Sequence, residues 1–374
     1  MPIAVQYKSG SRIPLKELEA YLAQVLGEAV RVVAVRRLGG SEEAGDEKVY
    51  GYGVPLRIDY EVAGRPRRAV LHTLKPDPFG HQHRADRAGI LLWSHEAFNR
   101  LPRHVRSLNV GAFDKAGQLV PLHEIDEVFL LTDYVDGREY GHDLVRLREG
   151  GALTAIDLPR CDALADYLLE IHAQRGGDPS LYTRRIRDLI GHGECIMGLI
   201  DSYPRDHAWI TAARLQRIEE LAVRWRWRLR GRAHRLAQVH GDFHPWNILF
   251  DQDSTLHVLD RSRGEWGDPA DDVTCLSINY VFESVQRRGR LEGEFAALFE
   301  RFWQRYRAAL PPREADELLE VAPPFVAWRA LVLASPLWYP QISDAHRRLF
   351  FNLIERVLEA DRFNPEQVND YLGA

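Results

Sequence analysis

Residues 238–250 read QVHGDFHPWNILF, and the next apolar run, residues 256–260, reads LHVLD. Three groups in this stretch carry chemistry: the carboxylate of Asp242, the amide of Asn247 five positions later, and the carboxylate of Asp260 at the end of the second run. Any one of them alone would be interpreted as a turn former. Together they supply what phosphoryl transfer requires, a group that orients the attacking hydroxyl and hard oxygen ligands for Mg²⁺.

The two apolar runs predict a hairpin. The turn residues Asp251-Gln252-Asp253-Ser254 separate them, so Asn247 and Asp260 are expected near the ends of two paired strands, facing one metal site. An Asp base followed five positions later by an Asn is also the loop arrangement of kinases.

The motif HGDFHPWNILF, the VLD at 258–260 and the GDPADD at 267–272 resemble the aminoglycoside phosphotransferase and choline kinase-like family, small-molecule kinases with a protein-kinase-like fold. The resemblance covers most of the chain at the level of element order. It implies an α+β, two-lobed fold with a small antiparallel-sheet N-terminal lobe and a larger, mainly helical C-terminal lobe. It also implies that Asp242 is the catalytic base and that Asn247 and Asp260 are the Mg²⁺ ligands.

The N-terminal third has the pattern of a small α+β lobe. Apolar residues at helical spacing, ending in Gly27, predict a helix, and Val-, Ile- and Leu-rich stretches between Gly-containing turns predict strands. The expected helices are 15–26 and 84–101, and the expected strands are 30–38, 55–62, 67–74 and 128–134. Helical patterns dominate after Val135-Asp136-Gly137, so we expect a nucleotide-binding lobe at 1–136 and a helical lobe with the catalytic loop and acceptor site at 137–374.

Lysine is rare in this chain, which narrows the search for a phosphate-binding cation. Only 5 of the 49 basic residues are Lys, all in the first third. Kinases of this shape use a basic residue on the third strand, paired with a helix carboxylate. Lys75 at the end of the third strand and Glu96 on the following helix are the preferred pair. His72 is the rival, and strand alternation allows only one of the two to point into the cleft.

The loop that would contact the phosphates and the segment that would contact adenine are predicted from short patterns of a few residues. Gly39, Gly40 and Ser41 resemble the start of the family's glycine-containing loop, with Gly51 and Gly53 as the alternative. The segment from Asp133 to Val135 occupies the expected link between lobes, where backbone groups would contact adenine.

Residues around the motif have other expected roles. Gly241 and Pro245 make a helix improbable there, so His240 and His244 are not expected to form a helical zinc site. In the GDPADD segment, Asp268, Asp271 and Asp272 are expected to brace the catalytic loop.

In the resembling family the acceptor binds to the helical lobe, and its pocket is the part that members share least. The acceptor pocket is sought in the insert 139–204 and in residues 328–339. Arg261 and Arg263 follow Asp260, where they could contact a phosphate or an anionic acceptor, or pair with Glu265 and Asp268.

Composition excludes several classes of protein. The 374 residues are 45% hydrophobic and 28% charged, with a formal charge of −5, so neither disorder nor a nucleic-acid binder driven by bulk charge is expected. The basic run 224–235 is interpreted as the solvated side of a helix. The three Cys residues are far apart, no apolar run is long enough for a membrane span or a signal peptide, and a cytoplasmic location is expected.

We therefore expect an ATP-dependent, Mg²⁺-requiring O-phosphotransferase whose partner is a small hydroxyl compound, with no nucleic-acid or membrane partner. The alternative is a non-catalytic kinase-like protein that binds a nucleotide or a partner, and a kinase acting on a protein side chain is a third possibility. The sequence names neither the acceptor nor the oligomeric state, and it does not separate ATP from GTP.

Overall fold

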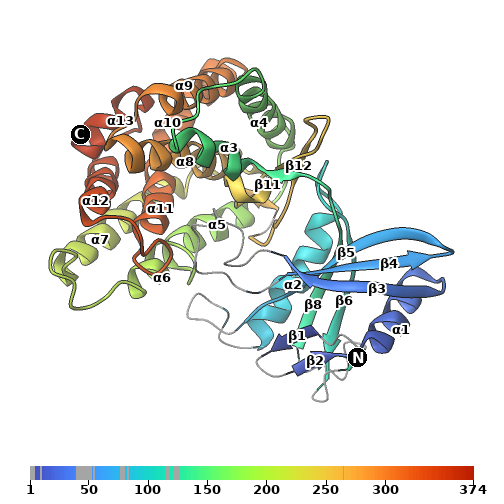
Figure 1. The fold of residues 1–374 in the computed structure, drawn as a ribbon. Coiled ribbons are helices and arrows are strands. Elements are labelled where there is room, and N and C mark those ends of the chain that lie inside the picture. The colour runs from blue at the N-terminus through green and yellow to red at the C-terminus, as the bar shows by residue number, and fades with distance from the viewer. Residues whose placement is uncertain are drawn as a thin grey trace. The chain divides into compact units, whose positions relative to one another are not determined.

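The structure of the protein is a computed structural model that describes residues 5–8, 11–38, 53, 55–75, 81, 84–114, 118–120, 127–263 and 265–374. The chain divides into two compact units (Figure 1). Among the described residues, the first unit takes those up to Asp136 together with the short segment His257–Ser262, and the second unit takes the rest.

The first unit is built on an antiparallel sheet. In the described part of this unit the main sheet has six strands in the order β3-β4-β5-β8-β6-β7. The strands are β3 (Val30–Arg37), β4 (Leu56–Val62), β5 (Arg65–Thr73), β6 (Ser107–Phe113), β7 (Leu119–Val120) and β8 (Glu127–Asp133), with a separate pair β1 (Val5–Lys8) and β2 (Ser11–Ile13). The turn from β4 to β5 is tight, with Ala63 and Gly64 both at positive φ.

A helix packs on each face of this sheet. Leu18 and Leu22 of α1 (Leu15–Leu26) join one apolar cluster with Leu131 of β8, whereas Leu91 of α2 (Arg84–Phe98) joins a second cluster with the adjacent Leu130. Neighbouring strand residues point to opposite faces, so the two helices cover opposite sides. The helices and strands expected in this part of the sequence are confirmed, apart from shifts of a few residues at their ends.

The second unit is mainly helical (Figure 1). Its helices are α3 (Tyr140–Arg148), α4 (Asp157–His172), α5 (Pro179–Gly191), α6 (Ile196–Asp201), α7 (Ala212–Leu229), α8 (Ala270–Arg288), α9 (Gly293–Ala308), α10 (Pro312–Val321), α11 (Pro323–Ala334), α12 (Asp344–Glu359) and α13 (Val368–Leu372), with short 3₁₀ turns η2 (Ala233–Arg235), η3 (Pro245–Asn247) and η4 (Pro365–Gln367). Its short strands are β9 (Arg138–Glu139), β10 (Ala237–Gln238), β11 (Ile248–Phe250) and β13 (Trp266–Gly267), and β12 (Leu256–Val258) lies where the chain passes to the first unit.

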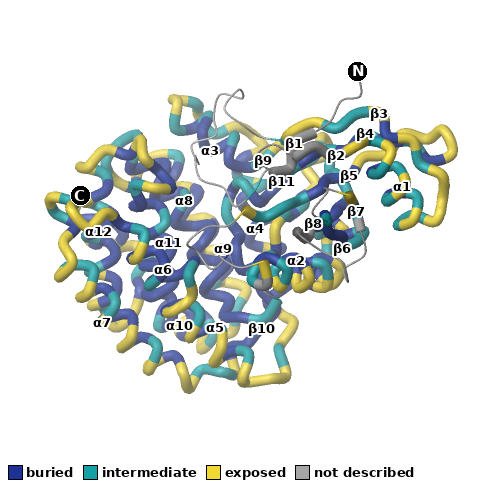
Figure 2. The backbone as a smooth tube through the Cα atoms, turned by 90° about the horizontal axis from the view of Figure 1, so that it is seen from below, coloured by how far each residue is buried: buried dark blue, intermediate teal, exposed yellow. Residues whose placement is uncertain are grey.

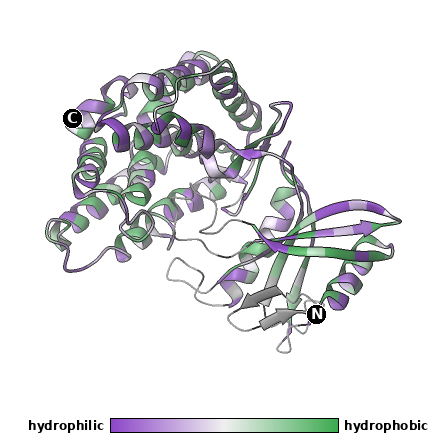
Figure 3. Cartoon of the chain, viewed as in Figure 1, coloured by the Kyte–Doolittle hydropathy of each residue, from purple (hydrophilic) through white to green (hydrophobic). Residues whose placement is uncertain are grey.

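Helices α8 and α11 form the centre of this unit. Nearly every residue of both is buried, and Figure 2 shows α8 largely in the colour of buried residues. Most other helices carry both apolar and polar residues, as the mixed colours in Figure 3 show, which is the pattern of helices with one buried face. The expected α+β class is confirmed. Within the described residues, no helix combines the length and the apolar character needed to cross a membrane.

Candidate active site

The loop that carries Asp242 begins with an unusual backbone conformation. Gly241 has a φ of 86°, a region that residues with a side chain rarely adopt. After Asp242 the chain makes the single turn η3, and the Nδ1 of His244 accepts the N–H of Trp246 at 3.2 Å. As expected from Gly241 and Pro245, residues 240–244 form no helix.

A buried carboxylate from α8 holds this loop. Asp272 accepts the backbone N–H groups of His240 and Gly241, each at 2.7 Å, and lies 3.0 Å from the Nε2 of His172. Burial alone would raise the pKa of Asp272, but its hydrogen bond to His172 and the neighbouring histidines lower the pKa below its ordinary value. Asp272 therefore stays ionised and fixes the loop as the sequence predicted.

A second buried carboxylate fixes the start of α8. Asp268 forms two hydrogen bonds of 2.8 Å with Arg235 and accepts the Tyr182 hydroxyl and the Ala270 N–H, each at 2.9 Å. Burial raises the pKa of Asp268, but Arg235 together with the hydrogen bonds from Ala270 and Tyr182 lowers the pKa overall. The expected bracing role of Asp268 agrees with these contacts.

Asp242 is held from one side by Arg329 of α11. The Nη1 of Arg329 donates to Asp242 Oδ1 at 2.7 Å, while Nη2 donates to the Gly241 carbonyl at 2.9 Å and to Asp271 at 2.6 Å. Cys275 lies 4.0 Å from the same oxygen of Asp242. Burial raises the pKa of the Cys275 thiol well above its ordinary value, so the thiol is neutral.

The other oxygen of Asp242 faces a looser group of side chains. The Nη2 of Arg263 lies 3.5 Å from Asp242 Oδ2, and the Nε2 of His244 lies 4.0 Å from it. The Nε of Arg263 lies 3.8 Å from Glu194, and its guanidinium lies over the ring of Trp328. Arg263 is thus placed beside Asp242, whereas the sequence also left its pairing with Glu265 or Asp268 open.

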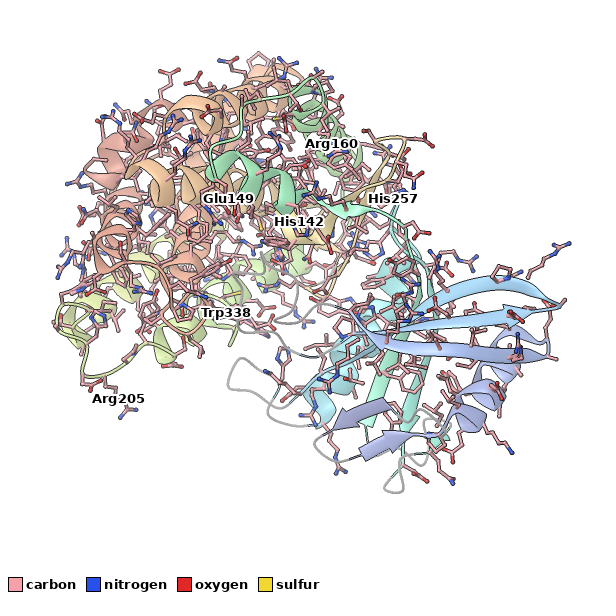
Figure 4. The ribbon with its side chains drawn as sticks, viewed as in Figure 1. His142, Glu149, Arg160, Arg205, His257 and Trp338 are labelled. Carbon is pink, nitrogen blue, oxygen red and sulfur yellow. The ribbon has the colours of Figure 1, made fainter. Side chains whose placement is uncertain are left out.

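Asn247 is connected directly to Asp242. Its Nδ2 donates to the Asp242 backbone carbonyl at 3.0 Å, which leaves the amide oxygen as the atom that can serve as a metal ligand. The neighbouring Trp246 packs edge-on against His142 of α3, labelled in Figure 4. A side chain at Gly141 would meet the Trp246 ring at 2.6 Å, so glycine is required at this position of α3 for the turn η3 to pack against the helix.

Asp260 belongs to the first unit and stands in a conformation rare for a residue with a side chain, with a φ of 53°. Leu259 packs into the apolar cluster beneath α2, and the Nη1 of the buried Arg261 donates to the Ala97 carbonyl at 3.2 Å. Arg261 therefore anchors this segment to α2. The role of Asp260 as a metal ligand stays a prediction.

The two rival phosphate-binding residues differ sharply. His72 lies within β5, with its Nε2 3.4 Å from the Thr132 hydroxyl. Although part of the residue is exposed, protein atoms surround its ring, and this burial lowers the pKa of His72 to about 4. Lys75 lies two residues beyond β5 and is exposed, and Glu96 is exposed on α2, 3.6 Å from Arg100. The pairing of Lys75 with Glu96 stays a prediction.

The remaining nucleotide-binding candidates are only partly described. Gly39, Gly40, Ser41 and Gly51 lie outside the described residues. A side chain at Gly53 would lie 1.8 Å from the Thr73 carbonyl, so close packing on β5 explains that glycine. In the expected adenine segment, the Asp133 N–H donates to the Arg106 carbonyl at 2.9 Å. The contact of Asp133 and Val135 with adenine stays a prediction.

Sequence reasoning missed Arg329, which contacts Asp242 directly, and Glu194, which lies 3.8 Å from Arg263. Arg329 is one of 44 arginines and lies 87 positions from Asp242. The only available signal was a charged residue inside the otherwise apolar segment FVAWRALVLA at 325–334, because a charge in such a segment is rarely buried without a partner.

Comparison with protein families gives one match: the model described as "APH: Phosphotransferase enzyme family" matches residues 96–316. No curated protein matches the sequence.

Several solved structures are similar to this chain. A protein from Haemophilus somnus 129PT, provisionally named a fructosamine-3-kinase, is 10% identical, with 92% of this chain and 96% of that chain covered and a TM-score of 0.52. A microcompartment-associated aminopropanol kinase is 17% identical, with 92% and 99% covered and a TM-score of 0.50. The aminoglycoside phosphotransferase APH(3'')-Id from Streptomyces rimosus, in complex with ADP and streptomycin, is 18% identical, with 72% and 90% covered and a TM-score of 0.42. The first two show a common fold.

Proposed function

The chain belongs to the phosphotransferase enzyme family whose model matches residues 96–316, and on that premise we propose that it transfers the γ-phosphoryl group of Mg·ATP to a hydroxyl of a small molecule. The observation that carries this proposal is the fixed pair formed by Asp242 and Asn247, joined by a 3.0 Å hydrogen bond on a loop braced by the buried Asp272.

Asp242 is the proposed base. Its carboxylate orients the acceptor hydroxyl and takes the proton as the oxygen attacks the γ-phosphorus. The attack forms the new O–P bond while the bond to ADP breaks, so the products are ADP and a phosphate ester. The nearby cations Arg263 and Arg329 offset the negative charge gathered around the reacting groups.

Asn247 and Asp260 are the proposed Mg²⁺ ligands. Both offer oxygen atoms, which is the donor type that Mg²⁺ prefers, and the hydrogen bond from Asn247 Nδ2 to the Asp242 carbonyl leaves the amide oxygen as the ligand atom. When bound, the metal neutralises charge on the nucleotide phosphates. Gly39, Gly40 and Ser41 are the proposed phosphate loop, and the Asp133 carbonyl and Val135 N–H the proposed adenine contacts.

A screen of nucleotide consumption tests the proposed function. Production of ADP from ATP is measured with aminoglycosides, macrolides, amino alcohols, sugars and nucleosides as acceptors. We expect acceptor-dependent turnover in one class, loss of turnover when EDTA removes Mg²⁺, and a loss of at least about 100-fold in Asp260→Ala, because the phosphates lose a metal-held charge. Full activity in Asp260→Ala would contradict the metal assignment.

Lys75, rather than His72, is proposed to hold the α and β phosphates, paired with Glu96. Because His72 has a pKa of about 4, it is neutral at pH 7 and offers no positive charge. We expect Lys75→Met to weaken ATP binding about 10- to 100-fold, the value of one charge-assisted hydrogen bond. His72→Gln, the matched control, should leave ATP binding nearly unchanged in calorimetry. The reverse ranking would assign the phosphate contact to His72.

A further inference from the structure

Arg329 occupies an unusual position for a charged side chain. It lies on α11, with only 6% of its side chain exposed, and its guanidinium stacks 3.7 Å above the Trp328 ring. From there it donates to Asp242 Oδ1, to the Gly241 carbonyl and to Asp271 Oδ1 at 2.6 to 2.9 Å. One rigid, planar group thus fixes both the base and the backbone just before it.

This arrangement treats the two oxygens of Asp242 differently. Oδ1 accepts a charge-assisted hydrogen bond of 2.7 Å from Arg329. Oδ2 lies 3.5 Å from Arg263 and 4.0 Å from His244, separations longer than the 2.7–2.9 Å typical of such bonds. Oδ1 is therefore the oxygen that Arg329 holds, and Oδ2 is the oxygen on the side of Arg263 and His244.

Other charged groups also surround Asp242. Asp271 on α8 shares Arg329 with Asp242 and receives a second cation, Arg185, at 2.6 Å. Arg263, which lies 3.8 Å from Glu194, faces Oδ2. His240 and His244 flank Asp242 in its own loop, with His240 Nδ1 3.3 Å from the Asp242 backbone nitrogen, and Cys275 is a neutral neighbour. Arg329, at 2.7 Å, lies closer to Asp242 than Arg263, at 3.5 Å.

We propose that Arg329 is a positioning residue of the active site: it holds Asp242 by Oδ1 and so presents Oδ2 to the proton of the acceptor hydroxyl. The proposal rests on the proposed function only in giving Asp242 the role of base. The contact with Arg329 exists independently of that role and can be tested without turnover.

The contact is tested first by a double-mutant cycle in urea unfolding, using Arg329→Met, Asp242→Asn and the double variant. In the wild type, Asp242→Asn is expected to lower the unfolding midpoint, because it removes the anion that Arg329 binds. In the Arg329→Met background the same change is expected to raise the midpoint, because it removes a buried charge that has lost its cation. Equal effects in the two backgrounds would overturn the proposal.

The positioning role is tested by kinetics. Arg329→Met is expected to lower kcat on the order of 100-fold, with little change in the KM for ATP, because the base is misplaced. Arg329→Lys, which keeps the charge but not the planar, forked guanidinium, should recover part of kcat.

Arg347→Lys is the matched control, because Arg347 on α12 is also buried but its hydrogen bonds go to the carbonyls of Ala334, Ile342 and Tyr339. It should lower stability while leaving kcat near the wild-type value. If Arg329→Lys and Arg329→Met behave like Arg347→Lys, Arg329 is merely structural and the proposal is wrong. If the wild type shows no turnover, the proposed function fails, and the unfolding cycle still decides the contact. If Arg329→Met does not fold, the cycle is run with Arg329→Lys.

Discussion

Replacing Asp242 with Asn is expected to lower phosphoryl transfer about 10²- to 10⁴-fold, because an amide of the same shape cannot accept the hydroxyl proton. The variant should keep the native fold and its affinity for ATP, since Asn can still accept a hydrogen bond from Arg329 at the Oδ1 position, although the lost charge lowers the unfolding midpoint. Turnover is measured as ADP formation, and ATP binding by calorimetry.

A matched control is Asp251→Asn, in the turn after β11. Asp251 accepts the backbone N–H groups of Asp253 and Thr255 near the protein surface, so the same chemical change there should leave turnover near the wild-type value. If Asp242→Asn and Asp251→Asn are equally active, Asp242 is not the base.

Replacing Asp272 with Ala is expected to cause the largest loss of stability, about 3–5 kcal/mol in the free energy of unfolding. The change removes the acceptor of the backbone N–H groups of His240 and Gly241, which are buried. It also removes the carboxylate that His172 contacts. Turnover should also fall, because these N–H groups set the path of the chain into Asp242.

The control for this prediction is Asp162→Ala, which removes a partly exposed ion pair with Arg301 and should cost under about 1 kcal/mol. Chemical denaturation of both variants gives the comparison. A cost for Asp272→Ala as small as that for Asp162→Ala would show that the catalytic loop holds its conformation without the carboxylate.

Much of the fold could be predicted because it depends on local patterns. Neighbouring residues alone predict the alternation of buried and partly buried residues along β4 and the end of α1 at Gly27. The bracing role of Asp272 was also predictable, because it lies in a short motif whose spacing from the HGD sequence resembles a known family.

The partners of the site residues could not be predicted in the same way. Arg329 reaches Asp242 from α11, and Arg261 fixes the segment after Asp260 by a bond to Ala97, 164 positions earlier. Such pairs depend on how helices pack, and periodicity within one element does not determine that packing. These contacts also explain part of the preference for arginine over lysine in this chain. Arg235 and Arg329 each donate from two nitrogen atoms of one planar group, which a lysine side chain cannot do.

The central claim is that this protein moves a phosphoryl group from ATP to an organic hydroxyl, and the most direct test follows that group. The wild-type protein is incubated with ATP labelled in the γ-phosphate, Mg²⁺ and the acceptor panel, and the labelled products are separated. We predict a labelled phosphate ester of one acceptor class, formed together with ADP and absent in Asp242→Asn. Binding of Mg·ATP with no labelled ester, or with inorganic phosphate as the only labelled product, would contradict the claim and favour a kinase-like binding protein.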